Sequence, residues 1–229
     1  MENQNCPIHF GTSGHRGIIG DSYTPQHAIA IAHAVADYLM PSNQKTKPTL
    51  ILGYDTRQNH STNDNNSLTK QVSDTLIHRG INVKCCDSFS PTPVVSWAIT
   101  QEKTNGGLIL TASHNPPQYD GIKFNPENGA PAPEHVTRMI EEKANHYLLH
   151  PKDTPKNTAI KGNLTFINPI SAFVDALIHT CTDMLNFTPT NPFPIAIDCK
   201  HGTVGPVWKV ISDTLHLQDT RIHEAPLPD

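Results

Sequence analysis

The sequence predicts an α/β fold: a three-layer α/β/α arrangement with a mixed, largely parallel sheet, followed by an incomplete second α/β domain. Two observations lead to this prediction. Apolar residues at helical spacing alternate along the chain with short, branched apolar runs that glycine or proline bounds. The pair Thr-Pro occurs twice just before a helical pattern, where it forms an N-cap and a first helical position. Such alternation places helices on both faces of a sheet.

The first elements follow from these signals in order. Thr24-Pro25 and the apolar residues after it predict a helix over about 25–40. Residues 49–54 and 81–85 are predicted strands. An Asn-rich loop leads from the first strand into a helix that ends at Gly80.

The next elements repeat the pattern. Ser90-Pro91-Thr92-Pro93 opens a helix that reaches about residue 101, and the glycine-bounded run 106–111 is a predicted buried strand. A helix over about 133–150 follows. The order through residue 111 is therefore α-β-α-β-α-β.

A polar stretch then predicts a domain boundary. We expect a first domain over 1–150, a linker over 151–167 and the N-terminal part of a second domain over 168–229. The second part contains a predicted helix over about 168–185, a strand over 194–199, a helix beginning near 205 and a short strand over 220–223. These elements are too few to close a core of their own, so we expect the second part to be either a fragment, as in a truncated chain, or a unit that something else completes.

Composition limits the classes of partner. The formal charge of −4 on 229 residues gives no basic field, which predicts no nucleic-acid and no membrane partner. No apolar stretch approaches the roughly 18 to 20 residues needed to cross a bilayer. The five cysteines lack C-x-x-C spacing and the opening lacks a signal peptide, so we expect reduced thiols and a cytoplasmic protein.

Ser113 is the first candidate functional residue. It lies just past the carboxyl end of the predicted strand 106–111, the edge of an open α/β sheet where ligands bind. A hydrolase elbow needs G-x-S-x-G, whereas this chain has Thr-Ala-Ser-His-Asn at 111–115, so a serine hydrolase is only a weak alternative. A phosphate carrier requires converging cations and amide donors. The glycine-rich loop 11–17 with Arg16, together with Lys123, supplies such groups.

Four segments then resemble one family. FGTSGHRG, PTPVVSWAI, TASHNPPQYDGIKFNPENGAPAP and IDCKHGTVG occur in the same order and at similar spacing as in the α-D-phosphohexomutases, with the bacterial phosphoglucomutase branch most similar. The resemblance implies a four-domain isomerase of carbohydrate metabolism. Such an enzyme interconverts hexose 1-phosphate and hexose 6-phosphate through a phosphoserine and a hexose 1,6-bisphosphate. This chain would correspond to the first domain and the start of the second.

The resemblance also implies roles for individual residues. Ser113 would donate and accept the phosphoryl group, and its phosphate would contact Mg²⁺. Arg16 and Lys123 would neutralise charge on the transferring phosphoryl group or assist proton movement, while His114, also a catalytic candidate, and Asn115 would flank that group. Pro116-Pro117 would stiffen the loop that aims the phosphoserine, because transfer depends on placement. The phosphate-binding candidates are Thr12, Ser13, Gly14, His15 and Asn115.

The chain departs from the family pattern in two places. The D-x-D-x-D loop that holds Mg²⁺ in the family is absent, so the remaining carboxylate ligands are missing and we expect no activity from this chain alone. Where the family has a serine three residues after the arginine of GYDTR, this chain has His60. A non-catalytic remnant that binds a phosphosugar or a partner is the alternative function. We interpret KHGTVG, which lacks the Walker pattern, as a strand-to-helix turn.

Overall fold

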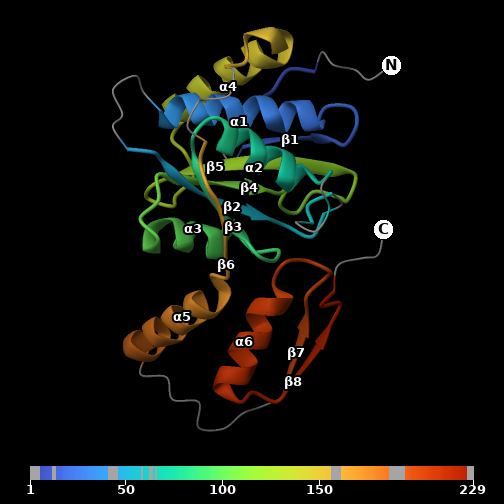
Figure 1. Ribbon diagram of the computed structural model, residues 1–229. Helices are drawn as coiled ribbons and strands as arrows, with labels where there is room; N and C mark the ends of the chain where they lie inside the picture. The colour runs from blue at the N-terminus through green and yellow to red at the C-terminus, as the bar shows by residue number, and fades with distance from the viewer. Residues whose placement is uncertain are drawn as a thin grey trace.

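The computed structural model describes residues 6–11, 14–40, 46–57, 59–61, 64, 66–155, 161–185 and 194–225. Its main feature is a six-stranded sheet with the strand order β1-β5-β4-β2-β3-β6 (Figure 1). The strands are β1 (His15–Ile18), β2 (Thr49–Tyr54), β3 (Asn82–Cys86), β4 (Gly106–Leu110), β5 (Tyr119–Pro126) and β6 (Leu164–Ile167).

The sheet is mixed, as predicted. β2 pairs in parallel with β3 and β4, and β3 pairs in parallel with β6. β5 runs antiparallel to both of its neighbours, β4 and β1. All five residues of β4 are buried, which explains why its sequence is a continuous apolar run rather than an alternating one.

Helices cover both faces of this sheet, so the predicted three layers are confirmed (Figure 1). On one face α1 packs against α2 and α4, and on the other face α3 packs against β2 and β4. A short 3-10 helix, Pro151–Asp153, follows α4. The bounds are α1 (Pro25–Leu39), α2 (Leu68–His78), α3 (Thr92–Gln101) and α4 (Glu134–Leu149), each within a few residues of the expected helix.

A smaller unit, which we call the second unit, follows the six-stranded sheet and its helices, which we call the first unit. It contains α5 (Ile170–Leu185), β7 (Ile195–Asp198), α6 (Gly205–Leu215) and β8 (Asp219–Ile222). β7 and β8 form a parallel two-stranded sheet, and α5 contacts both α6 and α3. Among the described residues, few buried apolar side chains lie where α3, α5 and α6 meet: Val94, Ile170, Val174 and Val207. The large core lies instead between the six-stranded sheet and the helices on its two faces, α1, α2 and α4 on one and α3 on the other.

Three strands were not expected from the sequence. β1 and β5 contain glycine and charged residues and lack a clear apolar alternation. β6 lies in the segment 151–167 that was predicted to be a linker, but it pairs with β3, so the end of that segment belongs to the main sheet. The division into domains otherwise stays a prediction.

Within the described residues, no helix has both the length and the apolar character needed to span a bilayer.

Candidate functional site

Ser113 lies in the loop between β4 and β5, residues 111–118, which we call the serine loop. The residue is exposed and not packed in the core. Its backbone has a φ of 60°, a left-handed conformation that costs a non-glycine residue roughly 1–2 kcal/mol. The Ser113 N–H donates to Thr111 Oγ1 at 2.9 Å. The surrounding contacts therefore hold Ser113 in a conformation that its own backbone disfavours.

An open cleft of about 1180 Å³ surrounds this serine. Such a volume is large enough for a sugar phosphate. Several distant segments line it: Ile19, the loop after β2 (Asp55, Thr56 and Arg57), the start of α3 (Ser90–Pro93), much of the serine loop, Lys123, and the turn Lys200–Thr203. The cleft thus lies at the carboxyl ends of β2 and β4, where the sequence placed the site.

Arg57 holds the serine loop by its main chain. Its guanidinium donates to four carbonyl oxygens, at distances of 3.2, 2.8, 3.0 and 2.7 Å, and these belong to Ser113, Asn115, Pro116 and Tyr119. Its Nε donates to Asp55 Oδ2 at 3.1 Å. Sequence reasoning did not select Arg57, although its place after β2, the strand beside β4, was a usable signal.

Two further cations approach the serine loop from β1 and β5. Arg16 Nη1 donates to Asn115 Oδ1 at 2.9 Å. Lys123 lines the cleft although only 9% of the residue is exposed. Burial and the nearby charge of Arg16 lower the pKa of Lys123, against the opposite effect of Asp55. The structure therefore brings Arg16 to the serine loop and places Lys123 in the wall of the cleft beside it.

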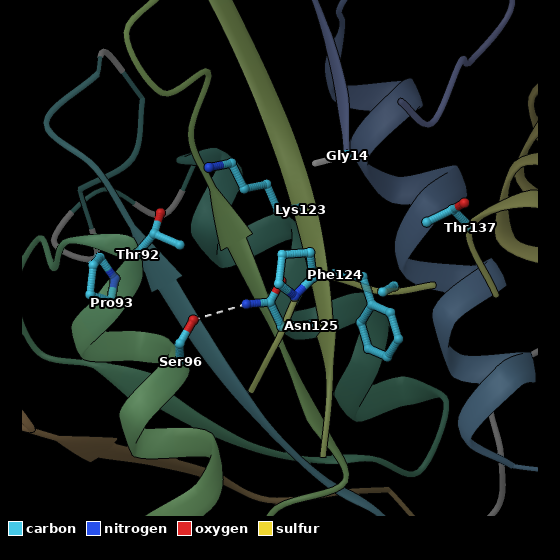
Figure 2. A pocket seen from close by; sticks show the side chains of 10 residues that line it. Gly14, Thr92, Pro93, Ser96, Lys123, Phe124, Asn125 and Thr137 are labelled. Carbon is cyan, nitrogen blue, oxygen red and sulfur yellow. Dashed lines mark hydrogen bonds between the residues drawn. The ribbon is translucent and has the colours of Figure 1, made fainter. Parts of the chain in front are cut away.

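Lys123 also borders a second, smaller pocket of about 150 Å³. Figure 2 shows this pocket between β5 and the start of α3, with Asn125 Nδ2 donating to Ser96 Oγ at 2.9 Å. Thr92, Pro93 and Lys123 line both cavities. The small pocket therefore lies next to the cleft, and these three residues separate the two.

The other predicted residues divide into two groups. His114 and Asn115 line the cleft, as expected for groups beside Ser113. Gly14 lines the small pocket, has a φ of 102° and lies so close to β5 that a Cβ would approach the Ile122 carbonyl to 2.2 Å. Only glycine fits there.

His15 does not reach the cleft. It is 3% exposed, and its ring stacks on His27 at 5.5 Å between centroids. Burial lowers the pKa of His15, although a hydrogen bond to the His9 backbone opposes this shift. Adjacent residues of a strand point to opposite faces, so β1 cannot present both His15 and Arg16 to one ligand. Thr12 and Ser13 lie outside the described residues.

The turn KHGTVG contributes more than a connection. Lys200, His201, Gly202 and Thr203 line the cleft, and Lys200 and His201 both have left-handed backbones. The Thr56 hydroxyl donates to the His201 carbonyl at 2.9 Å, which joins the second unit to the loop after β2. Its interpretation as a strand-to-helix turn was correct, but its place in the site follows only from the packing of the two units.

No metal centre is formed by the described part of the chain. It contains no group of three or more His, Cys, Asp or Glu side chains that could hold an ion. Ser113, the predicted contact to Mg²⁺, has no carboxylate cluster beside it among these residues. The donor set therefore does not by itself fit a magnesium ion.

Comparisons with known proteins show which family this chain is similar to. A family model described as phosphoglucomutase/phosphomannomutase, alpha/beta/alpha domain I, matches residues 7–149. A phosphoglucomutase from Komagataeibacter xylinus is 31% identical over 227 residues, covering 93% of this chain and 39% of that protein. A protein from Methanosphaera stadtmanae, provisionally named a phosphoglucosamine mutase, is 30% identical over 203 residues, covering 87% and 40%.

A solved structure extends the likeness to three dimensions. A protein from Thermus thermophilus, provisionally named a phosphomannomutase, matches with a TM-score of 0.78 at 27% identity, covering 97% of this chain and 47% of that one. This chain spans about 40% of the length of the curated relatives it matches. The names of these three relatives refer to different sugars, so the likeness does not select one hexose.

Proposed function

The chain belongs to the phosphoglucomutase/phosphomannomutase family, the α-D-phosphohexomutases, and we propose that Ser113 is its phosphoryl carrier. The proposed reaction is the interconversion of a hexose 1-phosphate and a hexose 6-phosphate. Because the chain spans about 40% of its curated relatives, this activity is proposed for a whole protein that contains the chain together with the further domains of the family.

One observation carries the proposal: an exposed serine in a left-handed backbone opens onto a cleft lined by Arg57, Lys123 and Lys200. A serine in a hydrolase would need a base within hydrogen-bond reach. A phosphoserine instead needs fixed placement and positive charge, because its three phosphate oxygens carry about −1.5 to −2 charge. The surroundings of Ser113 match the second requirement.

The proposed phosphoryl transfer needs only the phosphorylated serine and the hexose phosphate. The free hydroxyl of the hexose phosphate attacks the phosphorus of phosphorylated Ser113, the bond from phosphorus to Ser113 Oγ breaks, and a new P–O bond forms on the sugar. The sugar hydroxyl loses one proton and Ser113 Oγ gains one. The hexose 1,6-bisphosphate then turns round in the cleft, and its other phosphoryl group returns to Ser113 by the reverse step.

The neighbouring side chains have separate roles in this scheme. Lys123 lies beside the phosphoryl group, and because its pKa is lowered it exchanges a proton more readily than an ordinary lysine. Arg16 stabilises negative charge and orients Asn115, to which it is bonded. His114 and Asn115 contribute hydrogen bonds to phosphate from the serine loop itself.

Mg²⁺ belongs to the proposal as the ion that neutralises phosphoryl charge in the family. One oxygen of phosphorylated Ser113 would contact it, but the described residues lack the other ligands, so no step is assigned to the ion.

A cytoplasmic location also stays a prediction.

Labelling tests the proposal directly. The protein is incubated with hexose 1,6-bisphosphate carrying ³²P, and phosphopeptides are mapped by mass spectrometry, both after this treatment and in protein isolated from its own cells. We expect the phosphate on Ser113. Ser113→Ala should abolish the labelling, whereas Ser171→Ala, an exposed serine of α5 away from the cleft, should leave it unchanged.

Two results would contradict the proposal. An unmodified Ser113 in both preparations would favour a non-catalytic remnant of the family that binds phosphosugars or a partner. Reaction of Ser113 with a fluorophosphonate, without labelling by the bisphosphate, would favour a hydrolase.

A further inference from the structure

We propose that His60 is a positioning residue for Ser113, because its imidazole ring joins Asp55 to Asp120 and so fixes the groups that hold the serine loop. The inference rests on the proposed role of Ser113 as a phosphoryl carrier. It concerns the position at which this chain departs from the family pattern, which has a serine there.

The ring is almost completely buried between two carboxylates. His60 is 1% exposed. Its Nδ1 lies 3.0 Å from Asp55 Oδ1, and its Nε2 lies 3.0 Å from Asp120 Oδ2. These partners belong to different segments: Asp55 follows β2, and Asp120 is in β5, three residues before Lys123.

The geometry determines the charge of the ring. An ionised carboxylate only accepts hydrogen bonds, so both ring nitrogens must donate, and only the imidazolium has two N–H groups. Burial alone would lower the pKa of His60, but the hydrogen bonds and charges of Asp120 and Asp55 outweigh it and raise the pKa to about 9. The ring is therefore a cation at neutral pH, and its positive charge reduces the repulsion between the two carboxylates.

Asp55 is connected to Ser113 through two hydrogen-bonded residues. It accepts hydrogen bonds from Arg57 Nε and from the Thr111 hydroxyl. Arg57 in turn binds the Ser113 carbonyl, and Thr111 Oγ1 accepts from the Ser113 N–H. A single residue, Arg57 or Thr111, thus connects Asp55 by hydrogen bonds to each main-chain polar group of Ser113.

Asp120 provides a third connection. Its Oδ1 accepts from the Gly121 N–H at 2.7 Å, and it lies on the strand that carries Lys123. The Tyr23 hydroxyl is buried beside the same acidic groups, and burial and the charges of Asp120 and Asp55 raise its pKa. Tyr23 therefore stays neutral, and His60 is the cation that joins the two carboxylates. A serine at position 60 would have one donor and no charge.

The test combines a spectroscopic and a kinetic measurement. In protein with ¹⁵N-labelled histidine, NMR should show the His60 ring doubly protonated at pH 7.5. The amide signals of Ser113 and Asn115 should shift with the same midpoint, near pH 9, as the ring loses its proton. The control is His135→Gln, an exposed position on α4, which should leave these signals unchanged.

The kinetic arm uses His60→Gln, which is neutral, and His60→Ser, which restores the family residue. With hexose 1,6-bisphosphate as donor, we expect the maximal rate of Ser113 phosphorylation to fall about 10-fold or more and the donor KM to change by less than about twofold. The wild-type rate should fall as the pH rises through about 9, with the same midpoint as the His60 ring, because the cation is lost. The variants should keep only the fall that the deprotonation of Lys123 causes.

A ring that is neutral at pH 7.5 would overturn the inference, and this measurement needs no variant. A folded His60→Gln protein with the wild-type rate and pH profile would also overturn it. If the wild-type protein is not phosphorylated at all, the proposed function fails, but the NMR arm still decides whether His60 positions the serine loop.

Discussion

Lys123 illustrates how a single residue acquires its chemistry from its neighbours. It has little contact with water, it lies near the positive charge of Arg16, and Asp55 only partly compensates. Each of the first two effects disfavours the ammonium form, so the proton leaves at a lower pH than in an ordinary lysine. The residue therefore remains a phosphate-binding cation below its pKa and loses that role as the pH rises through it.

This lowered pKa predicts a pH dependence for phosphate binding. The affinity for inorganic phosphate should already fall at a pH below 10.5, the ordinary lysine value, where phosphate stays dianionic. In Lys123→Arg the fall should be smaller, because arginine keeps its charge there. Titration calorimetry across this range measures both proteins.

A neutral replacement of Lys123 measures how much this residue contributes to phosphate affinity. Lys123→Met should weaken phosphate binding about 10-fold at pH 8, since a charge-assisted hydrogen bond contributes about 1.5–3 kcal/mol. Lys209→Met, at an exposed lysine of α6, is the matched control. Equal affinities in the two variants would show that Lys123 does not contact the anion.

At the scale of elements, one carboxylate joins three helices on the same face of the sheet. Asp37 of α1 accepts from Arg79 Nη2, at the end of α2, and from the Tyr147 hydroxyl of α4, each at 2.6 Å. Arg79 is 6% exposed and also donates to the His33 carbonyl. These bonds lie at the edge of the large core, where the helices meet.

Removal of this charge should destabilise the first unit. Asp37→Asn leaves the buried Arg79 without its counter-ion, and we expect the free energy of unfolding to fall by about 2 kcal/mol or more. Asp74→Asn breaks a half-exposed pair with Lys70 within α2 and should change the free energy of unfolding by less than about 0.5 kcal/mol. Urea titrations compare the two variants, and similar losses would contradict a special role for Asp37.

Over the whole molecule, the two units are held by cores of very different size. The first has a continuous core between the sheet and four helices, whereas, in the part of the chain that the structure describes, four buried apolar residues join α3, α5 and α6. Trp97 of α3 packs edge-on against Phe173 of α5 and strengthens that junction. The second unit therefore has less buried apolar surface with which to resist unfolding.

The two tryptophans can report on the units separately. In Trp97→Phe, emission from Trp208 of α6 should change at a lower urea concentration than the far-ultraviolet circular dichroism of the main sheet and helices. In Trp208→Phe, the transition of Trp97 should lie closer to that of the first unit. Coincident transitions by all probes would show that the two units unfold as one.

The main elements follow from local sequence because their signals are local. Helix caps, prolines and apolar periodicity predicted helices α1 to α6 and the strands β2, β3, β4, β7 and β8. β1, β5 and β6 carry no such pattern. β5 becomes a buried strand because it lies between β1 and β4, and its charged residues are then compensated by partners from other segments, such as His60 for Asp120.

The sequence by itself determined the α/β class, the family and the place of Ser113 at the end of β4, because these depend on short segments read in order. Only the tertiary structure decided that Arg57 binds the serine loop, that His15 turns away from the cleft and that Lys200 and His201 line it. The physical reason is that hydrogen bonding and burial join groups that are distant in the chain. The partners of His60, five and sixty residues away, are the clearest case.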